Sequence, residues 1–300
     1  MSVQPVQHTL TLDDIEIYAF EWGQPGGQQV LLIHATGFHA RCWDQVVAQL
    51  PSDWHIFAVD MRGHGRSSKI APYTWAQFGD DLLAICEALS IHDAIAVGHS
   101  MGGHCVTHAA GHRPELFRHL VLVDPVIMPP ESYSAESRHD YASPKDHPIA
   151  RRRGHFDSVA QMQQRYAERM PYMLWQKDVF DDYCTHGLLP LGGDKGFELA
   201  CPGEVEASIY MGTSDASIFA LIPQIETPTV VLRASPREVG STQMDFSMSP
   251  TWPQLAAMFP RGQDVHLPEL THFIPMQDPR LVADFILAGA GQELLLERQA

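Results

Sequence analysis

The sequence predicts an α/β fold, in which a mostly parallel central sheet is flanked by helices and carries an inserted helical cap. In the first 124 residues, short runs of Val, Leu and Ile alternate with longer segments that have apolar residues at helical spacing. The runs at residues 30–33 and 120–123 are apolar at every position, which is typical of parallel strands buried on both faces. The alternation stops after about residue 125, and this break predicts the insertion.

The first half of the chain supplies most of the predicted sheet. Strands at residues 6–12 and 15–22 flank Asp13 and Asp14, a pattern that predicts a hairpin. The alternation then predicts, in chain order, a strand at 29–34, a helix at 43–50, a strand at 55–60, a helix at 75–89, a strand at 94–99, a helix at 101–112 and a strand at 120–124. Strands separated by helices indicate parallel pairing with crossover connections.

The second half begins with a different pattern. Between residues 125 and 223 no segment has a convincing strand pattern, and helices are expected at 157–169 (capped by Asp157), 177–186 and 202–211. The alternation resumes with an expected strand at 229–234, helix at 252–259, strand at 264–267 and helix at 279–288. The simplest organisation is a core formed by residues 1–125 and 227–300, with a cap at 126–226.

Composition and charge limit the classes of partner. The chain has 300 residues, 45% of them hydrophobic, and a formal net charge of −16. This charge would repel nucleic acid, and the only basic run, residues 151–153, is expected to be a solvated surface or a local salt-bridge site. No apolar run approaches the roughly 18 residues of a membrane span, and the N-terminus has no secretory pattern. We expect a cytoplasmic protein with a small-molecule substrate and neither nucleic-acid nor membrane partners.

Neither cysteines nor histidines predict a metal site. The five cysteines form no C-x-x-C pair, so a disulfide framework or a cysteine zinc site is not indicated. His104, His108 and His112 are spaced four apart and would share one helix face. However, no H-E-x-x-H glutamate accompanies them. We therefore expect no metal and no cofactor.

A nucleophile motif stands between a predicted strand and a predicted helix. Residues 98–102, GHSMG, fit the pattern G-x-S-x-G. A sharp strand-to-helix turn exposes such a serine in strained geometry, and small residues two positions before and after it avoid collisions. Ser100 would then lie at a helix N-terminus, where the backbone dipole favours developing negative charge.

Four segments in one order resemble the α/β-hydrolase fold family over nearly the whole chain. They are LLIHATGF at residues 31–38, DMRGHGRS at 60–67, GHSMGG at 98–103 and THFIPM at 271–276. Together they are specific for the fold, but they do not identify a substrate. The resemblance implies that Ser100 is the nucleophile and that His272 is its general base.

The resemblance also implies where the oxyanion hole lies. Its two donors would be the backbone N–H groups of Thr36 and Met101. Ala35 stands where the family usually has glycine. We expect His34 to anchor this loop, and residues 60–67 to form a turn that shapes the fold without entering the chemistry.

The acid of the triad has two candidates, and both follow Ser100 and precede His272 in the chain. The family usually places the acid after the strand that follows the cap; this chain has no aspartate at that place, and Glu238 is one residue further on. Some relatives instead carry it at the end of the earlier strand, where Asp124 stands. We favour Asp124, because it ends a strand at the same edge as the nucleophile. The alternative role for Asp124 is a turn cap before Pro125.

The leading functional hypothesis is hydrolysis of a small, mostly apolar carboxylic ester or lactone through an acyl-enzyme. One alternative is carbon–carbon bond hydrolysis of a ring-cleavage product, although relatives of that kind often have asparagine where this chain has His99. The other alternative is a non-catalytic ligand-binding receptor. Phe38 and His99 are expected at the substrate site, and some aromatic residues of the cap are expected to line an apolar pocket.

Overall fold

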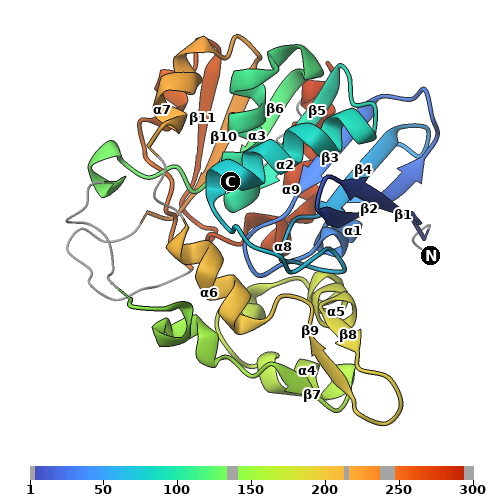
Figure 1. The fold of residues 1–300 in the computed structure, drawn as a ribbon. Helices are drawn as coiled ribbons and strands as arrows, with labels where there is room; N and C mark the ends of the chain where they lie inside the picture. Colours follow the sequence, from blue (N-terminus) through green and yellow to red (C-terminus); the bar gives the residue numbers. More distant parts are fainter. Residues whose placement is uncertain (1–3, 134–140, 213–215, 237–246, 294–300) are drawn as a thin grey trace.

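The computed structural model describes residues 4–133, 141–212, 216–236 and 247–293, and Figure 1 shows the fold. An eight-stranded sheet has the order β1-β2-β4-β3-β5-β6-β10-β11. The strands are β1 (Val6–Leu12), β2 (Ile15–Gly23), β3 (Gln29–Ile33), β4 (His55–Asp60), β5 (Ala94–His99), β6 (Phe117–Val123), β10 (Thr229–Ala234) and β11 (Gly262–Leu267). β2 pairs antiparallel with β1 and β4, and every other neighbouring pair is parallel. The predicted fold class is confirmed.

Helices cover both faces of this sheet. One buried cluster joins a sheet face to α2 (Trp75–Ala88) and α3 (Met101–His112), and another joins the opposite face to α1 (Asp44–Val47) and α9 (Pro279–Gly289). α2 begins where the Thr74 hydroxyl accepts from the backbone N–H of Gln77 at 3.3 Å. Its buried face includes Phe78, Leu82 and Ile85, which follow helical spacing. Truncating such a side chain to alanine typically costs about 2–5 kcal/mol.

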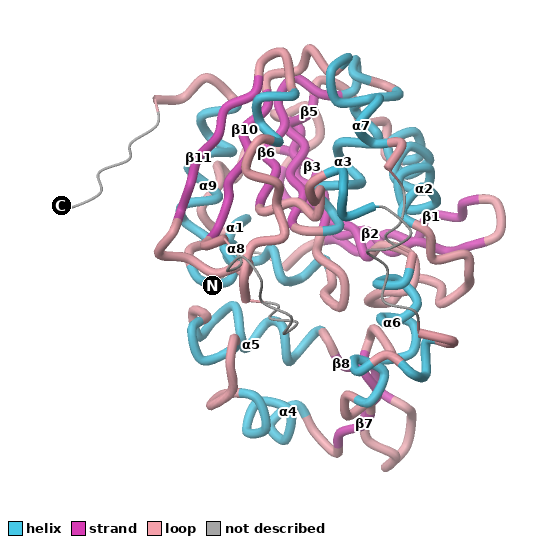
Figure 2. The backbone as a smooth tube through the Cα atoms, turned by 90° about the vertical axis from the view of Figure 1, so that its left-hand side faces the viewer, coloured by secondary structure: helices cyan, strands magenta, loops and turns pink. Residues whose placement is uncertain are grey.

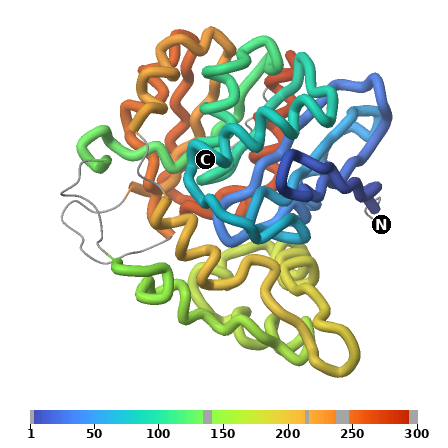
Figure 3. Tube along the Cα trace, viewed as in Figure 1, coloured from blue at the N-terminus to red at the C-terminus, as the bar shows by residue number. Residues whose placement is uncertain are grey.

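The segment between β6 and β10 forms a separate layer, drawn green to yellow in Figure 3, at one end of the sheet. It contains α4 (Val159–Tyr166), α5 (Lys177–His186), α6 (Gly203–Met211), and a three-stranded antiparallel sheet of β7 (His155–Phe156), β9 (Phe197–Leu199) and β8 (Leu188–Pro190). The short α7 (Ile218–Leu221) packs on α3 near the end of this segment. Figure 2 shows β7 and β8 beside α4 and α5. The sequence has no convincing strand pattern here, because strands of two or three residues are too short to create an alternating pattern.

Two expected helices are shorter in the structure, and local chemistry explains both. The cap of α4 is Ser158, whose hydroxyl accepts from the backbone N–H of Gln161 at 3.2 Å, rather than Asp157, and α4 ends at Tyr166. In the segment 252–259 only a 3₁₀ turn at Leu255–Met258 forms. Pro260 follows this turn, and a residue before proline is driven to extended geometry, as Phe259 is with ψ 132°.

The expected helix at 43–50 is also divided. Ala40–Trp43 forms a 3₁₀ turn that continues into the four-residue α1. The backbone N–H groups of Gln49 and Leu50 bond three residues back, to Val46 and Val47, so the last turn is tightened before Pro51. The last two elements, α8 (Ile274–Gln277) and α9, follow β11 after a loop that contains His272. In the described ranges, no helix has the length and apolar character that a membrane crossing needs.

Candidate active site

Ser100 occupies a sharp turn between β5 and α3. Its backbone has φ 58° and ψ −116°, a region that costs a non-glycine residue free energy and that surrounding structure must enforce. The N–H of Ser100 donates to the carbonyl of Val123 at 3.0 Å, which fixes the turn against β6. A Cβ at Gly102 would lie 2.2 Å from the carbonyl oxygen of Ile33. Glycine at this position therefore lets α3 start directly beside β3.

His272 reaches Ser100 from the other end of the sequence. It follows β11, and its Nε2 lies 3.0 Å from the Oγ of Ser100. The backbone N–H of His272 donates to the carbonyl of Ser247 at 2.7 Å. Ser100 is 6% exposed and His272 is 8% exposed. This pair is therefore nearly enclosed, a setting that strengthens electrostatic interactions within it.

Asp124 lies on the far side of the imidazole. Its Oδ2 is 2.6 Å from the Nδ1 of His272, and the residue is fully buried. Its Oδ1 accepts from the backbone N–H of Ala234 at 3.0 Å and from the hydroxyl of Ser249 at 2.6 Å. The buried carboxylate is thus satisfied on one oxygen and directs the other at the imidazole. Glu238, the other candidate acid, lies outside the described residues.

In the loop after β3, the N–H groups of Gly37 and Phe38 donate hydrogen bonds within the protein. The N–H of Gly37 donates to the Nε2 of His64 at 3.0 Å, and that of Phe38 donates to the carbonyl of Ala35 at 3.1 Å. Within the described part of the chain, neither the N–H of Thr36 nor that of Met101 has a hydrogen-bond acceptor. The N–H groups of Thr36, in this loop, and of Met101, at the start of α3, are thus available, as the resemblance implied.

His34 and His64 hold this loop in shape. The Nε2 of His34 accepts from the N–H of Met61 at 3.0 Å, and its Nδ1–H donates to the carbonyl of Ala35 at 2.8 Å. The Nδ1–H of His64 donates to the carbonyl of Arg62 at 2.9 Å. Burial lowers the pKa of His34 and lowers the pKa of His64 well below its ordinary value. Both rings are therefore neutral, the form that can accept at Nε2.

The two residues expected at the substrate site occupy different positions. Phe38 is 9% exposed, and its ring contacts Trp175, Tyr183 and Phe273 at centroid distances of 5.3–5.9 Å. His99 is fully buried, and its Nε2–H donates to the backbone carbonyl of His272 at 2.8 Å. Phe38 therefore packs against residues of the segment between β6 and β10, whereas His99 holds the loop of His272.

The residues considered for metal binding have other partners. The Nε2 of His108 lies 3.2 Å from Asp80, and the Nδ1 of His112 lies 2.9 Å from the carbonyl of His108. A group that the sequence did not indicate, Asp44, Asp182 and His186, has potential ligand atoms within 4.8 Å of one another.

The guanidinium of Arg41 donates hydrogen bonds of 2.5–2.9 Å to the carboxylate of Asp44. Its positive charge at this position disfavours a cation among those three residues. The geometry therefore gives no support for a metal centre there.

An ion pair lies against the oxyanion loop, and the sequence indicated only one half of it. Nη1 of Arg152 lies 2.5 Å from Oε2 of Glu206, and Nη2 of Arg152 donates to the hydroxyl of Tyr183 at 3.0 Å. The side chain of Arg152 is 14% exposed and that of Glu206 is 5% exposed. A Cβ at Gly37 would lie 2.5 Å from Oε1 of Glu206. Nothing in the sequence pattern connects positions 152 and 206, which are far apart in the chain.

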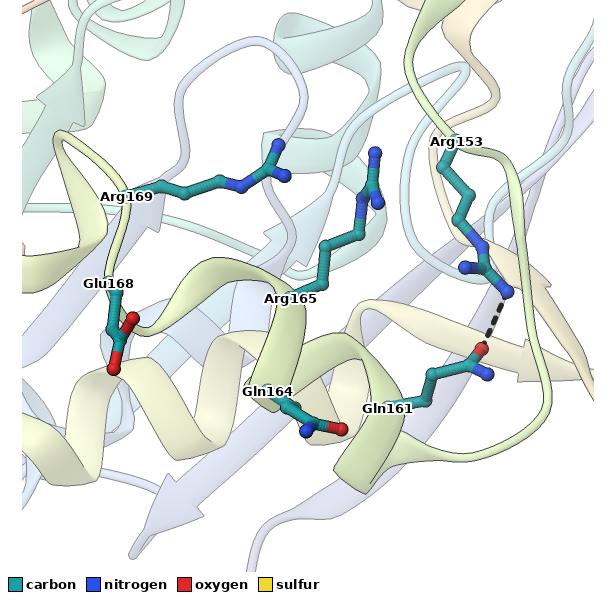
Figure 4. A pocket seen from close by; sticks show the side chains of 6 residues that line it. All are labelled: Arg153, Gln161, Gln164, Arg165, Glu168 and Arg169. Atoms are coloured by element: carbon teal, nitrogen blue, oxygen red, sulfur yellow. Dashed lines mark hydrogen bonds between the residues drawn. The ribbon is translucent and has the colours of Figure 1, made fainter.

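A hollow beside α4, with a volume of about 510 Å³, is rich in arginine. Its lining residues are Arg153, Gln161, Gln164, Arg165, Glu168 and Arg169. Figure 4 shows that these side chains come from α4 and its flanking loops and that Arg153 bonds to Gln161. The lining contains no nucleophile with an adjacent base. The chemistry is therefore better supported at Ser100.

Part of the chain matches a known family model. Residues 28–146 match the model described as "alpha/beta hydrolase fold". Lipase LipV of Mycobacterium tuberculosis (strain ATCC 25618 / H37Rv) is 35% identical over 113 residues, which is 38% of this chain and 43% of the lipase. The 3-oxoadipate enol-lactonase 2 of Acinetobacter baylyi (strain ATCC 33305 / BD413 / ADP1) is 30% identical over 138 residues, which is 45% of this chain and 52% of the lactonase. The matches thus span about half the length of these curated relatives.

A solved structure extends the similarity over the whole fold. E-2-(acetamidomethylene)succinate hydrolase has a TM-score of 0.76 and 19% sequence identity, and the match covers 96% of this chain and 100% of that one. The enol-lactonase from Burkholderia xenovorans LB400 has a TM-score of 0.65 and 17% identity, covering 95% of this chain and 100% of that one. At such identities the likeness establishes the fold alone.

Proposed function

Because this chain belongs to the α/β-hydrolase fold family, we propose that it is a serine hydrolase that cleaves a small, mostly apolar carboxylic ester or lactone through an acyl-enzyme. The observation that carries this proposal is the chain of contacts from Ser100 through His272 to Asp124, at 3.0 Å and 2.6 Å. Nucleophile, base and orienting acid are each within hydrogen-bond reach of the next. Family membership alone would support only the fold.

In the first half of the proposed reaction, the Oγ of Ser100 attacks the substrate carbonyl carbon while Nε2 of His272 accepts the hydroxyl proton. The buried carboxylate of Asp124 keeps the imidazole's Nδ1 protonated and stabilises the imidazolium. The tetrahedral oxyanion accepts from the N–H groups of Thr36 and Met101. Collapse breaks the carbon–oxygen bond to the leaving group, which takes the proton from His272.

In the second half, water attacks the acyl-enzyme, and His272 accepts one of its protons. The second tetrahedral intermediate uses the same two N–H donors. Its collapse breaks the bond to Oγ of Ser100, which recovers its proton from His272 and releases the carboxylic acid. One such donor typically contributes 10²–10³-fold to kcat.

The surroundings of the triad support the substrate class. Buried aromatic rings of the loops and the cap, including Phe38, Trp175 and Phe273, form one apolar cluster beside His272. Apolar walls with a few polar groups are typical of small-molecule sites. We propose that residues 126–226 act as the cap that closes this site and selects the substrate.

The test is hydrolysis of a chain-length series of p-nitrophenyl esters by wild type and Ser100→Ala. We expect short to medium chains to be cleaved by wild type, with turnover lost in the variant and a melting temperature that is nearly unchanged. If wild type is inert on every ester, ester hydrolysis is wrong. Equal rates in both proteins would show that another group performs the chemistry.

A further inference from the structure

The region between the triad and the cap contains buried hydrogen-bond donors that the proposed mechanism does not use. Trp175 is 7% exposed, and its indole Nε1 has no hydrogen-bond partner among the described residues. Thr36, 4% exposed, likewise has a side-chain hydroxyl without a partner in the described part of the chain. Buried polar groups are usually satisfied, so such orphans require an explanation.

Trp175 lies close to the reacting groups. Its ring centroid is 5.5 Å from that of Phe273, which is 5.6 Å from the imidazole of His272. It is also 5.8 Å from Phe38 and 5.2 Å from Tyr183. The ring of Phe273 therefore lies between the indole of Trp175 and the imidazole of His272. Trp175 belongs to the same aromatic cluster that we propose covers the substrate.

Arg152 brings further donors to the same cluster. It contacts Tyr183, which packs against Trp175, and its partner Glu206 lies against Gly37, the neighbour of Thr36. A guanidinium has five N–H donors. Two are engaged by Glu206 and Tyr183, and none of the other three has an acceptor in the described ranges.

The charge at this place limits what those donors can bind. Glu206 already balances the positive charge of Arg152 in a pair that is almost wholly buried. A substrate carboxylate would add an unbalanced negative charge in a chain of net charge −16, and burying an unpaired charge is costly. A neutral carbonyl oxygen would accept the same hydrogen bonds without that penalty.

We propose that the substrate's acyl part carries a second, uncharged acceptor, a ketone or amide carbonyl, which the N–H of Trp175 and the guanidinium of Arg152 bind on the cap side of the reacting carbonyl. This inference rests on the proposed ester hydrolysis and deepens it. It names oxo-acyl esters or lactones as the preferred class. The polar acceptor would distinguish them from plain aliphatic acyl groups of the same length.

Three p-nitrophenyl esters of matched shape test the inference: the pentanoate, the 4-oxopentanoate and the hydrogen succinate. The second adds a neutral carbonyl to the first, and the third replaces the terminal methyl of the second by a charged oxygen. After subtraction of uncatalysed rates, we expect kcat/KM to be about tenfold higher for the 4-oxopentanoate than for the pentanoate. The hydrogen succinate should be the poorest of the three.

Trp175→Phe removes the indole N–H and keeps an aromatic ring. In this variant, kcat/KM for the 4-oxopentanoate should be close to kcat/KM for the pentanoate. Trp43→Phe is the matched control, because the Nε1 of Trp43 is also buried without a partner in the described residues, but Trp43 ends the 3₁₀ turn before α1 and belongs to a different core cluster. The control should keep the wild-type ratio. Arg152→Ala alone would leave the buried carboxylate of Glu206 without its ion-pair partner. The double variant Arg152→Met with Glu206→Gln therefore tests the guanidinium. It should also lower the ratio of kcat/KM for the 4-oxopentanoate to that for the pentanoate.

The inference would be overturned if wild type had equal kcat/KM for the 4-oxopentanoate and the pentanoate. It would also be overturned if both Trp175→Phe and the double variant kept the wild-type preference for the 4-oxopentanoate. A preference for the hydrogen succinate would overturn the charge argument and with it the neutral acceptor. If all three esters are cleaved with equal kcat/KM and the cleavage depends on Ser100, only this inference fails. If none is cleaved, the proposed ester hydrolysis fails with it.

Discussion

The imidazole of His99 donates a hydrogen bond of 2.8 Å to the backbone carbonyl of His272, although the two residues are far apart in sequence. Burial, and next the neighbouring His272, lowers the pKa of His99 well below its ordinary value. The ring is therefore neutral, with its proton on Nε2, because a carbonyl can only accept. The residue before the nucleophile thus fixes the backbone of the proposed base.

We predict that His99→Phe lowers kcat by about tenfold or more with a smaller change in KM, because a loosened base misaligns the proton transfer. His99→Gln, which keeps a side-chain N–H, should recover part of the rate. The check is steady-state kinetics on one p-nitrophenyl ester. His104→Phe serves as control, since His104 is a buried histidine that packs on Trp75. Equal rates for His99→Phe and His104→Phe would contradict a positioning role.

The oxyanion loop is predicted to be sensitive to a single methyl group. Gly37 has φ +81°, and a Cβ there would meet Glu206 at 2.5 Å, whereas Gly26 has φ +91° and open space around it. Gly37→Ala should lower kcat by about 10²-fold, because the shift displaces the proposed Thr36 donor. Gly26→Ala carries only the backbone cost of about 1–2 kcal/mol and should retain full activity. Thermal unfolding and ester kinetics on both variants provide the check, and similar kcat values would argue against the predicted loop shift.

The choice between the two candidate acids leads to opposite expectations. Asp124→Asn should reduce kcat by about 10⁴-fold, because the imidazole loses its orienting partner and adopts the wrong tautomer. Glu238→Gln should remain near wild type. Single-substrate kinetics at pH 8 distinguish them. Near-normal activity in both variants would mean that the acid is another residue or that none is needed.

Asp182 should make stability depend on pH. Burial raises the pKa of Asp182 to about 6, opposed by the hydrogen bond from Gln45. A carboxyl whose pKa is raised on folding stabilises the fold when protonated. That contribution is complete below the unfolded value near 3.9 and is lost as the pH rises through about 6.

Asp182→Asn removes this ionisation, and its uncharged amide can still accept from Gln45, which bonds to Asp182 at 2.7 Å in the wild type. The variant's melting temperature, relative to wild type, should therefore rise between pH 5 and pH 8. Asp178→Asn, on the same helix, serves as the control for the loss of one negative charge. A pH-independent difference for Asp182→Asn would contradict the predicted linkage.

The fold was predictable from the sequence because its signals are local. β3 and residues 120–123 of β6 are buried on both faces, so their apolar runs are visible without knowledge of their partners. The serine motif between β5 and α3 is local in the same way. The three-stranded sheet of β7, β9 and β8 gave no such signal, since β7 has only two residues and depends on β9 for its pairing.

The candidate site was predictable only in part, for the same physical reason. Ser100 and His272 stand in recognisable strings, and Asp124 stands at the end of an apolar strand. By contrast, Arg152 and Glu206 acquire their environment only when the insertion folds over the loop of Gly37. The orphan N–H of Trp175 depends on which rings surround it, and tertiary packing of that kind has no sequence period.

The most direct test of the central claim is covalent labelling at Ser100. Wild type and Ser100→Ala are treated with a fluorophosphonate, and intact mass and peptide fragmentation locate the adduct. We predict one adduct per chain, on Ser100, with loss of ester turnover in proportion to labelling, and no adduct in the variant. Equal labelling of the variant, or ester hydrolysis that continues in fully labelled wild type, would contradict a Ser100 acyl-enzyme.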